Sequence, residues 1–370
     1  MRLFLLLIFL VHWLLPYSVS AQNALLEPPK LEDSLSLPPP SPKVHVASAI
    51  LYDPDRKKIL FEQNADALIP PASLTKIMSM FVVLDAISQN KITMQTQVPV
   101  SRAAANEEGS RMGIREGDVV RLGDLLQGMA ISSGNDASYA VAEFVGGNRE
   151  NFIAMMNRKA KSLHMTSSHF ETPNGLPKPS QLTSARDMLI LADNYLQKYP
   201  WTISVFHSQR VLKYHNYVSW NKNPLLDQYP GANGLKSGWV RSSGHNLIFS
   251  AERAKKRLLG VILGAPSASD RAVEACRLLD AGFLYCFKQV NSVEEALDLL
   301  DPANYTIDLH KGAKEAIQLY GYVSQGSRGK RVYGMGKKKS VNREKSKPQT
   351  RKKKAPKKSK PGKQKIKKKR

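Results

Sequence analysis

Ser73 and Lys76 are the first residues whose types and spacing suggest chemistry. They lie three residues apart, just ahead of an apolar run from Ile77 to Leu84. If that run is a helix, both side chains lie on one face near its N-terminus. A serine hydroxyl attacks only when a base takes its proton, and a lysine can be that base only when burial or a second cation lowers its pKa. The same pattern also fits a helix cap followed by a solvated lysine.

A second polar segment lies between two apolar stretches and reads Ser132-Ser133-Gly134-Asn135-Asp136-Ala137. In one interpretation, Asn135 or Asp136 caps the helix that follows, from residue 137 to residue 145. In the other, Ser133 passes a proton between Lys76 and a leaving group, and Asn135 holds Lys76 and a substrate amide. The two interpretations are compatible.

A third segment supplies the second cation and reads Gly234-Leu235-Lys236-Ser237-Gly238-Trp239. It has the strongest strand signal in the chain, so Lys236 is either the protective lysine of an exposed edge strand or a functional group. In the functional interpretation, Lys236 lowers the pKa of Lys76 and attracts a substrate carboxylate. Gly238 would let a substrate backbone approach, and an edge strand can pair with an extended peptide.

The secondary-structure elements that position these residues are strands at both ends of the folded part and helices between them. A hairpin is predicted from residues 44–52 and 58–62, helices at 122–131, 135–145, 149–162 and 183–198, and later strands at 235–240, 245–251 and 258–263. This order predicts an α+β fold, in which an antiparallel sheet flanked by helices contains an inserted, mainly helical subdomain. A catalytic cleft would lie where the two parts meet.

The three segments, in this order and at spacings of 60 and 103 residues, resemble the motifs Ser-x-x-Lys, Ser-Gly-Asn and Lys-Ser-Gly of the penicillin-binding proteins and serine β-lactamases. The spacings are similar to those of the D-alanyl-D-alanine carboxypeptidases of low molecular mass. Two further stretches are similar to the wording of that family, Thr172-Pro173-Asn174-Gly175-Leu176 and Ser184-Ala185-Arg186-Asp187-Met188. The resemblance extends over residues 44–288 and implies the β-lactamase/transpeptidase-like fold.

The resemblance also implies roles for the matching residues. Ser73 would attack the carbonyl of the penultimate D-alanine of a peptidoglycan stem peptide, and Lys76 would be its general base. Ser133 would pass the proton to the departing D-alanine. The remaining residues would bind substrate: Asn135 holds the amide, Lys236, Ser237 and Arg271 lie at the terminal carboxylate, and the backbone N–H groups of Ser73 and Trp239 form an oxyanion hole beside Gly238. A surface helix-capping role explains Arg271 almost as well.

Three other functions remain open at this point. The enzyme could be a D,D-endopeptidase that cuts peptidoglycan cross-links, or a non-catalytic binder of polyanions. A β-lactamase fits less well, because the Glu-x-x-Leu-Asn loop of its commonest class has no match: Glu171 is followed by Thr-Pro-Asn-Gly. If the protein is a carboxypeptidase or an endopeptidase, β-lactams would be its covalent inhibitors.

Two departures from the family pattern limit the resemblance. The third motif usually ends in a threonine where this chain has Val240, so part of the carboxylate recognition changes. Many members also have a second β-rich domain and an amphipathic anchoring helix. Here residues 289–333 form only a reduced region, with one short helix expected at 313–320.

The N-terminal end is typical of an exported protein. Met1 and Arg2 precede an apolar stretch from Leu3 to Leu15, followed by small residues up to Ala21. This pattern predicts a secretory signal peptide over 1–21, and an uncleaved anchor is the alternative. Six prolines then indicate an extended linker over 22–43. We therefore expect a periplasmic or other extracytoplasmic protein.

The C-terminal end is strongly basic. Residues 337–370 hold 19 lysines or arginines and one acid, a net charge of +18 out of the formal +24 for the chain. We expect a disordered tail over 334–370. Because export makes nucleic acid an unlikely partner, an anionic membrane or envelope polymer is the expected contact; a solubilising tail without a partner is the alternative.

The cysteines and histidines give no sign of a metal or cofactor. Cys276 and Cys286 lie ten residues apart on one expected helix, a rise of about 15 Å, which exceeds the roughly 7 Å between bridged Cα atoms. Both are therefore predicted to be free, buried thiols. No pair of histidines has ligand spacing, so neither a metal nor a cofactor is expected.

Overall fold

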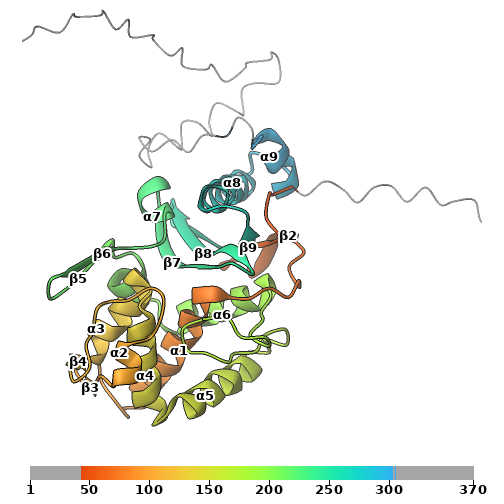
Figure 1. Ribbon diagram of the computed structural model, residues 1–370. Coiled ribbons are helices and arrows are strands. Elements are labelled where there is room, and N and C mark those ends of the chain that lie inside the picture. Colours follow the sequence, from red (N-terminus) through yellow and green to blue (C-terminus); the bar gives the residue numbers. More distant parts are fainter. Residues whose placement is uncertain (1–42, 303–304, 306–370) are drawn as a thin grey trace, which may run out of the picture. The chain divides into compact units, whose positions relative to one another are not determined.

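The computed structural model describes residues 43–302 and residue 305 (Figure 1). The expected signal peptide, nearly all of the linker, the short helix at 313–320 and the basic tail lie outside the described residues, so these predictions stay predictions. No helix among the described residues is long and apolar enough to cross a membrane.

A five-stranded sheet forms the centre of the fold, in the order β2-β1-β9-β8-β7 with every neighbouring pair antiparallel. Its strands are β1 (Ser48–Asp53), β2 (Lys58–Gln63), β7 (Ala232–Val240), β8 (Gly244–Arg253) and β9 (Lys256–Ala265). The predicted hairpin and the three later strands are therefore confirmed, each later strand being a few residues longer than expected. The strand with Lys236 is an edge strand, as predicted.

Both faces of the sheet are covered, because successive strand residues point to opposite sides. On one face, Leu51, Phe249 and Leu258 pack against α8 (Ala268–Cys286), which is followed by α9 (Val293–Leu299). On the other face, Ile50 and Ile248 pack with helices of the inserted part. The core continues past residue 288, since Val290, Val293, Ala296 and Leu297 are buried.

The inserted part between β2 and β7 is mainly helical, which confirms the α+β prediction. It contains α1 (Thr75–Ser88), α2 (Arg102–Ala105), α3 (Leu122–Gln127), α4 (Asn135–Gly146), α5 (Arg149–Ser162) and α6 (Ala185–Lys198), with the small strands β3 (Gln97–Pro99) and β4 (Val119–Arg121). A second small hairpin, β5 (Val211–Tyr214) and β6 (Tyr217–Trp220), and the short α7 (Leu225–Gln228) lead back to the sheet. The helix expected over 122–131 instead changes at Gly128 into a π-helical segment, Gly128–Ser132.

The helix α8 is continuous through both cysteines, and both thiols are free and buried, as predicted. Burial raises the pKa of Cys286 to about 11. These thiols are therefore packing groups of the α8 core and take no part in the site described below.

Candidate active site

Ser73 lies in a single 3-10 turn, Ala72–Leu74, directly before α1. The turn is tightly enclosed: a Cβ on Gly175 would lie 1.9 Å from the carbonyl oxygen of Ala72, and a Cβ on Gly238 would lie 3.0 Å from the backbone nitrogen of Ser73. Ala72 has a left-handed φ of 51°, a conformation that surrounding contacts must maintain. Only glycines at both neighbouring positions leave room for the serine turn.

Lys76 is fully buried and donates to three acceptors. Its Nζ lies 3.1 Å from Ser73 Oγ, 2.7 Å from Asn135 Oδ1 and 2.7 Å from the carbonyl oxygen of Asn174. None of these acceptors is a carboxylate, so burial, with the charge of Lys236 added, holds the pKa of Lys76 well below its ordinary value against the opposing charges of Asp136 and Glu107. An amine in this condition can accept a proton near neutral pH.

Ser133 and Lys236 form the opposite side of the site. Ser133 follows the π-helical segment with a left-handed φ of 60°, and its Oγ accepts a hydrogen bond of 3.0 Å from Lys236 Nζ. Lys236 also donates to the carbonyl oxygen of Ser237 at 2.9 Å. Burial, followed by the charges of Arg271 and Lys222, lowers the pKa of Lys236 to about 7. The second cation expected from the sequence therefore lies within the field of Lys76.

The interpretation of Asn135 or Asp136 as a helix cap holds in part: Asp136 Oδ1 accepts from the backbone N–H of Ala137 in the first turn of α4 at 2.9 Å, and both side chains also make tertiary contacts. The N-cap residue of α4 is Gly134, and it makes no side-chain cap bond. Asn135 accepts from Lys76 and donates to the carbonyl oxygen of Glu108 at 2.5 Å. Asp136 accepts from the backbone N–H groups of Met112 and Gly113, each at 2.9 Å. The segment after Ser133 thus fixes both Lys76 and the neighbouring loop.

Ser237 and Gly238 contact other parts of this chain. Ser237 donates its hydroxyl to the carbonyl oxygen of Lys222 at 2.9 Å. The small size of Gly238 admits the Ser73 turn, and the approach of a substrate backbone to this glycine stays a prediction. Lys222 in turn lies close enough to Lys236 to lower its pKa.

Trp239 and Arg271 lie near the outer end of β7. The indole of Trp239 is exposed and lies 6.0 Å, centroid to centroid, from the ring of His245. Arg271 is buried near the start of α8, which lowers its pKa to about 10. Its charge acts on both Lys236 and His245, and its buried Nε has no hydrogen-bond partner within the described part of the chain. Arg271 is therefore a buried cation whose charge acts on the site lysine, and it does not cap a helix on the surface.

Three residues of the site were missed in the sequence. Asn174 binds Lys76 through its carbonyl oxygen and donates its side-chain amide to Glu107 Oε1 at 2.7 Å. Asn246 donates to the carbonyl oxygen of Pro70 at 3.0 Å and so fixes the entry to the serine turn. The Thr-Pro-Asn-Gly-Leu stretch was a sequence signal for Asn174. Glu107 and Asn246 had no such signal, because each is a single acid or amide in a loop or strand.

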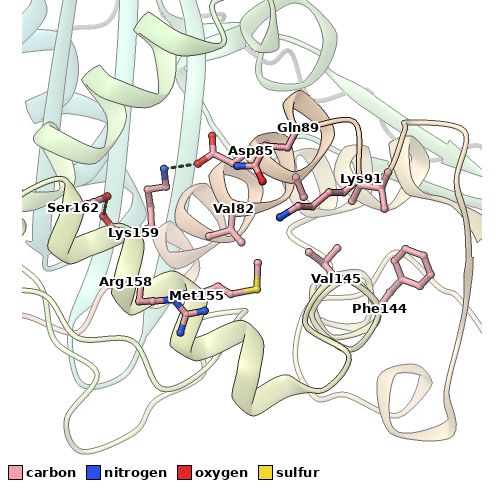
Figure 2. A pocket seen from close by; sticks show the side chains of 12 residues that line it. Val82, Asp85, Gln89, Lys91, Phe144, Val145, Met155, Arg158, Lys159 and Ser162 are labelled. Carbon is pink, nitrogen blue, oxygen red and sulfur yellow. Dashed lines mark hydrogen bonds and ion pairs between the residues drawn. The ribbon is translucent and has the colours of Figure 1, made fainter.

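A separate groove of about 530 Å³ lies at the far ends of α1, α4 and α5 (Figure 2). Its lining contains apolar and basic side chains, and consists of Val82, Asp85, Ala86, Gln89, Lys91, Ile92, Phe144, Val145, Met155, Arg158, Lys159 and Ser162. Lys159 reaches Asp85 within it. None of the predicted catalytic residues lines this groove.

The cleft can therefore support one kind of chemistry well. A serine hydroxyl lies beside a buried amine of lowered pKa, and a second hydroxyl lies beside a second buried amine. The buried cations Lys236 and Arg271 would attract the carboxylate at the end of a substrate, and the edge strand could pair with its extended backbone. These are the requirements of acyl transfer to a serine nucleophile.

Comparison with known proteins agrees with this chemistry. Residues 36–267 match the family model described as D-alanyl-D-alanine carboxypeptidase. The chain is 35% identical over 241 residues to the D-alanyl-D-alanine carboxypeptidase DacF of Bacillus subtilis, a match that covers 64% of this chain and 61% of the relative. It is 36% identical over 257 residues to DacD of Escherichia coli, which covers 68% and 66%.

A solved structure shares the fold. Penicillin-binding protein 6B of Escherichia coli superposes with a TM-score of 0.62 at 37% identity, covering 66% of this chain and 79% of that one. The match to the two curated relatives spans slightly less than two thirds of their length.

Proposed function

Because this chain belongs to the D-alanyl-D-alanine carboxypeptidase family, we propose that it removes the terminal D-alanine from peptidoglycan stem peptides through an acyl-enzyme on Ser73. The contact between Lys76 and Ser73 is the main support. It places the Ser73 hydroxyl beside an amine whose pKa is lowered by burial, so that the amine can accept the hydroxyl proton. The similarity to a named penicillin-binding protein supports β-lactams as covalent inhibitors of the same serine.

The first half of the reaction forms the acyl-enzyme. Neutral Lys76 takes the Ser73 proton, and Oγ attacks the carbonyl carbon of the penultimate D-alanine. The backbone N–H groups of Ser73 and Trp239 stabilise the oxyanion, a contribution that is worth about 10²-fold to 10³-fold in similar sites. The C–N bond then breaks, and the departing D-alanine amine receives its proton by way of Ser133. In the second half, water attacks the ester and restores Ser73.

Carboxylate recognition rests on cations. Lys236 and Arg271 attract the terminal carboxylate, since both are buried and each acts electrostatically on the same region. The family hydroxyl at the position of Val240 is missing, and the Ser237 hydroxyl donates a hydrogen bond to the backbone carbonyl oxygen of Lys222. While the Ser237 hydroxyl is engaged with Lys222, the two cations take a larger share of carboxylate binding than a hydroxyl-lined pocket would require.

Labelling with a fluorescent penicillin tests the nucleophile. We expect a stable covalent adduct on the parent protein and none on Ser73→Ala. Ser88→Ala is the matched control, because Ser88 is the last residue of α1, the helix that follows Ser73, and its hydroxyl bonds to the carbonyl of Asp85 and to Tyr199. A parent protein that takes no label would support the non-catalytic binder instead, and rapid release of hydrolysed penicillin would support a β-lactamase.

Products from purified peptidoglycan test the reaction. Stem peptides that lose the mass of one alanine residue support the carboxypeptidase. Conversion of cross-linked dimers into monomers, without that loss, would support the D,D-endopeptidase.

The setting of the reaction follows from the two ends of the chain. Residues 1–21 act as a signal peptide that exports the enzyme to its wall substrate, residues 22–43 act as the linker, and residues 44–288 form the catalytic domain, whose core α9 extends. The basic residues 337–370 attach the enzyme to anionic lipid or envelope polymer. Deletion of 337–370 should release the protein from anionic vesicles at low salt, and unchanged binding would refute the attachment.

A further inference from the structure

The β5–β6 hairpin has two unlike faces. Its strands pair Val211 with Trp220, Leu212 with Ser219, Lys213 with Val218 and Tyr214 with Tyr217. Because side chains alternate along a strand, Leu212 and Ser219 share one face with the two tyrosines, and the other four residues share the opposite face. Leu212 and Ser219 are buried, so the first face packs on the protein and the second lies outward.

The inner face is attached to the active site. Both strands contact the π-helical segment Gly128–Ser132, which leads into Ser133. Tyr217 lies across the neighbouring loop, where a Cβ on Gly113 would be 3.5 Å from its ring. Beyond the hairpin, the carbonyl oxygen of Lys222 accepts the hydroxyl of Ser237. The hairpin therefore borders the cleft, and Figure 1 shows it projecting from the protein next to β7.

The outer face is apolar, basic and open to solvent. Trp220 is 66% exposed and Val218 is 56% exposed, with Lys213 exposed between the two valines. Residues 211–222 contain no aspartate or glutamate, and Lys222 adds a further exposed cation at the end nearest the cleft. Large aromatic side chains that remain exposed next to a cleft are typical of binding surfaces.

We propose that this outer face, formed by Val211, Lys213, Val218 and Trp220, binds the sugar backbone of the same polymer whose stem peptide enters the cleft. A pyranose ring presents a flat face of weakly positive C–H bonds, which packs well on the electron-rich face of an indole. The polymer also bears stem-peptide carboxylates, which complement Lys213 and Lys222. Contacts of this kind, remote from the reacting bond, can be used to align the substrate. The inference rests on the proposed function, because it requires peptidoglycan in the cleft.

Two substrates separate a polymer subsite from a structural role. The tripeptide diacetyl-L-lysyl-D-alanyl-D-alanine fills only the cleft, whereas polymeric peptidoglycan reaches the hairpin. Trp220→Ala should lower kcat/KM on the polymer by roughly fivefold to thirtyfold, the usual effect of truncating a central aromatic contact, and should leave the tripeptide unchanged. Trp201→Ala is the matched control, since Trp201 is an exposed tryptophan outside the hairpin, and it should affect neither substrate.

Sedimentation of the full chain with insoluble peptidoglycan at high salt gives a second readout, which needs no turnover. The inference predicts weaker sedimentation for Trp220→Ala than for the parent, and equal sedimentation would overturn it. An equal loss of activity on both substrates would also overturn it, because the hairpin would then merely support Ser133. A Trp220→Ala variant that loses binding to anionic vesicles and keeps its activity on the polymer would assign the face to a membrane. If the parent cleaves neither substrate, the proposed function fails, and the sedimentation result still decides the subsite.

Discussion

The two ends of α1 each hold a buried or partly buried ionisable side chain, but only the one at the C-terminal end is paired with groups of opposite charge. At the N-terminal end, Lys76 is fully buried among neutral acceptors, and its pKa falls. At the C-terminal end, Asp85 accepts from Lys198 at 2.7 Å and from Tyr199 at 2.6 Å, and pairs with Lys159 beside the groove of Figure 2. Burial alone would raise the pKa of Asp85, but these hydrogen bonds outweigh it and the pKa lies below its usual value.

The difference teaches which charge can do chemistry. An ionised group whose partners neutralise it contributes to stability and keeps its protonation state through the neutral range. A group buried without a counter-ion gives up its proton readily and becomes a base. On this helix the distinction is made by neighbours: amide and carbonyl oxygens surround Lys76, while cations and a phenol surround Asp85.

The largest expected effect comes from removing the unpaired amine. Lys76→Met should lower the rate of penicillin acylation by roughly 10²-fold to 10⁴-fold, the usual contribution of a general base. Methionine has a similar length and fits a buried site but accepts no proton. Stopped-flow or gel-based labelling of Ser73 measures the rate.

The matched change at the other end is Lys159→Met, which removes the partner of Asp85. It should leave the acylation rate within about twofold of the parent, because Lys159 lies in the groove and not in the cleft. Comparable rates for Lys76→Met and the parent would show that another group takes the serine proton.

A smaller effect is expected from the second cation, in the pH profile. The pKa of Lys236 is about 7, so in the free enzyme this lysine is a cation below that pH and loses its charge as the pH rises through 7. Since a neutral Lys236 attracts the substrate carboxylate less, kcat/KM should decline above about pH 7. In kcat the decline should lie at higher pH, because bound carboxylate stabilises the cation.

Lys236→Arg tests this assignment. A guanidinium stays charged through the whole range, so the variant should lose the alkaline decline in kcat/KM even if its absolute rate is lower. An alkaline decline that persists unchanged in Lys236→Arg would belong to a different group.

The sequence predicted the three motifs and the elements that hold them because their signals are local. Ser73 and Lys76 are three residues apart at the start of a helix, and the sequence patterns of β7, β8 and β9 indicate strands. Their meeting was inferred from the resemblance, since spacings of 60 and 103 residues do not by themselves bring groups together. Whether the assigned roles hold stays a prediction for labelling and kinetics to test.

The supporting contacts could not be predicted, because they depend on backbone positions far apart in the chain. Lys76 is held by the carbonyl of Asn174, a group that every residue has and no side chain identifies. The close contact of Gly238 with the Ser73 turn, 165 positions earlier, could not be predicted for the same reason. The change of helix type at Gly128 was likewise not predicted; this glycine lies against Met112, whose Sδ would be 2.3 Å from a Cβ at that position.

The smallest effect is expected where the charge is already neutralised, at Asp85. Asp85→Asn should reduce the free energy of unfolding by about 1 to 2 kcal/mol at pH 7, because hydrogen bonds to a partly exposed ionised group become neutral ones. The folded pKa of Asp85 lies below its usual value of 3.8, so the carboxylate stabilises the fold fully above the unfolded pKa and loses this effect as the pH falls through the folded one. Urea unfolding should therefore separate the parent from Asp85→Asn at pH 7 and bring them together as the pH falls through the folded pKa of Asp85. Penicillin acylation should be unchanged at pH 7; a slower rate would mean that the groove end of α1 also sets the position of Lys76, and the two ends would then not be independent.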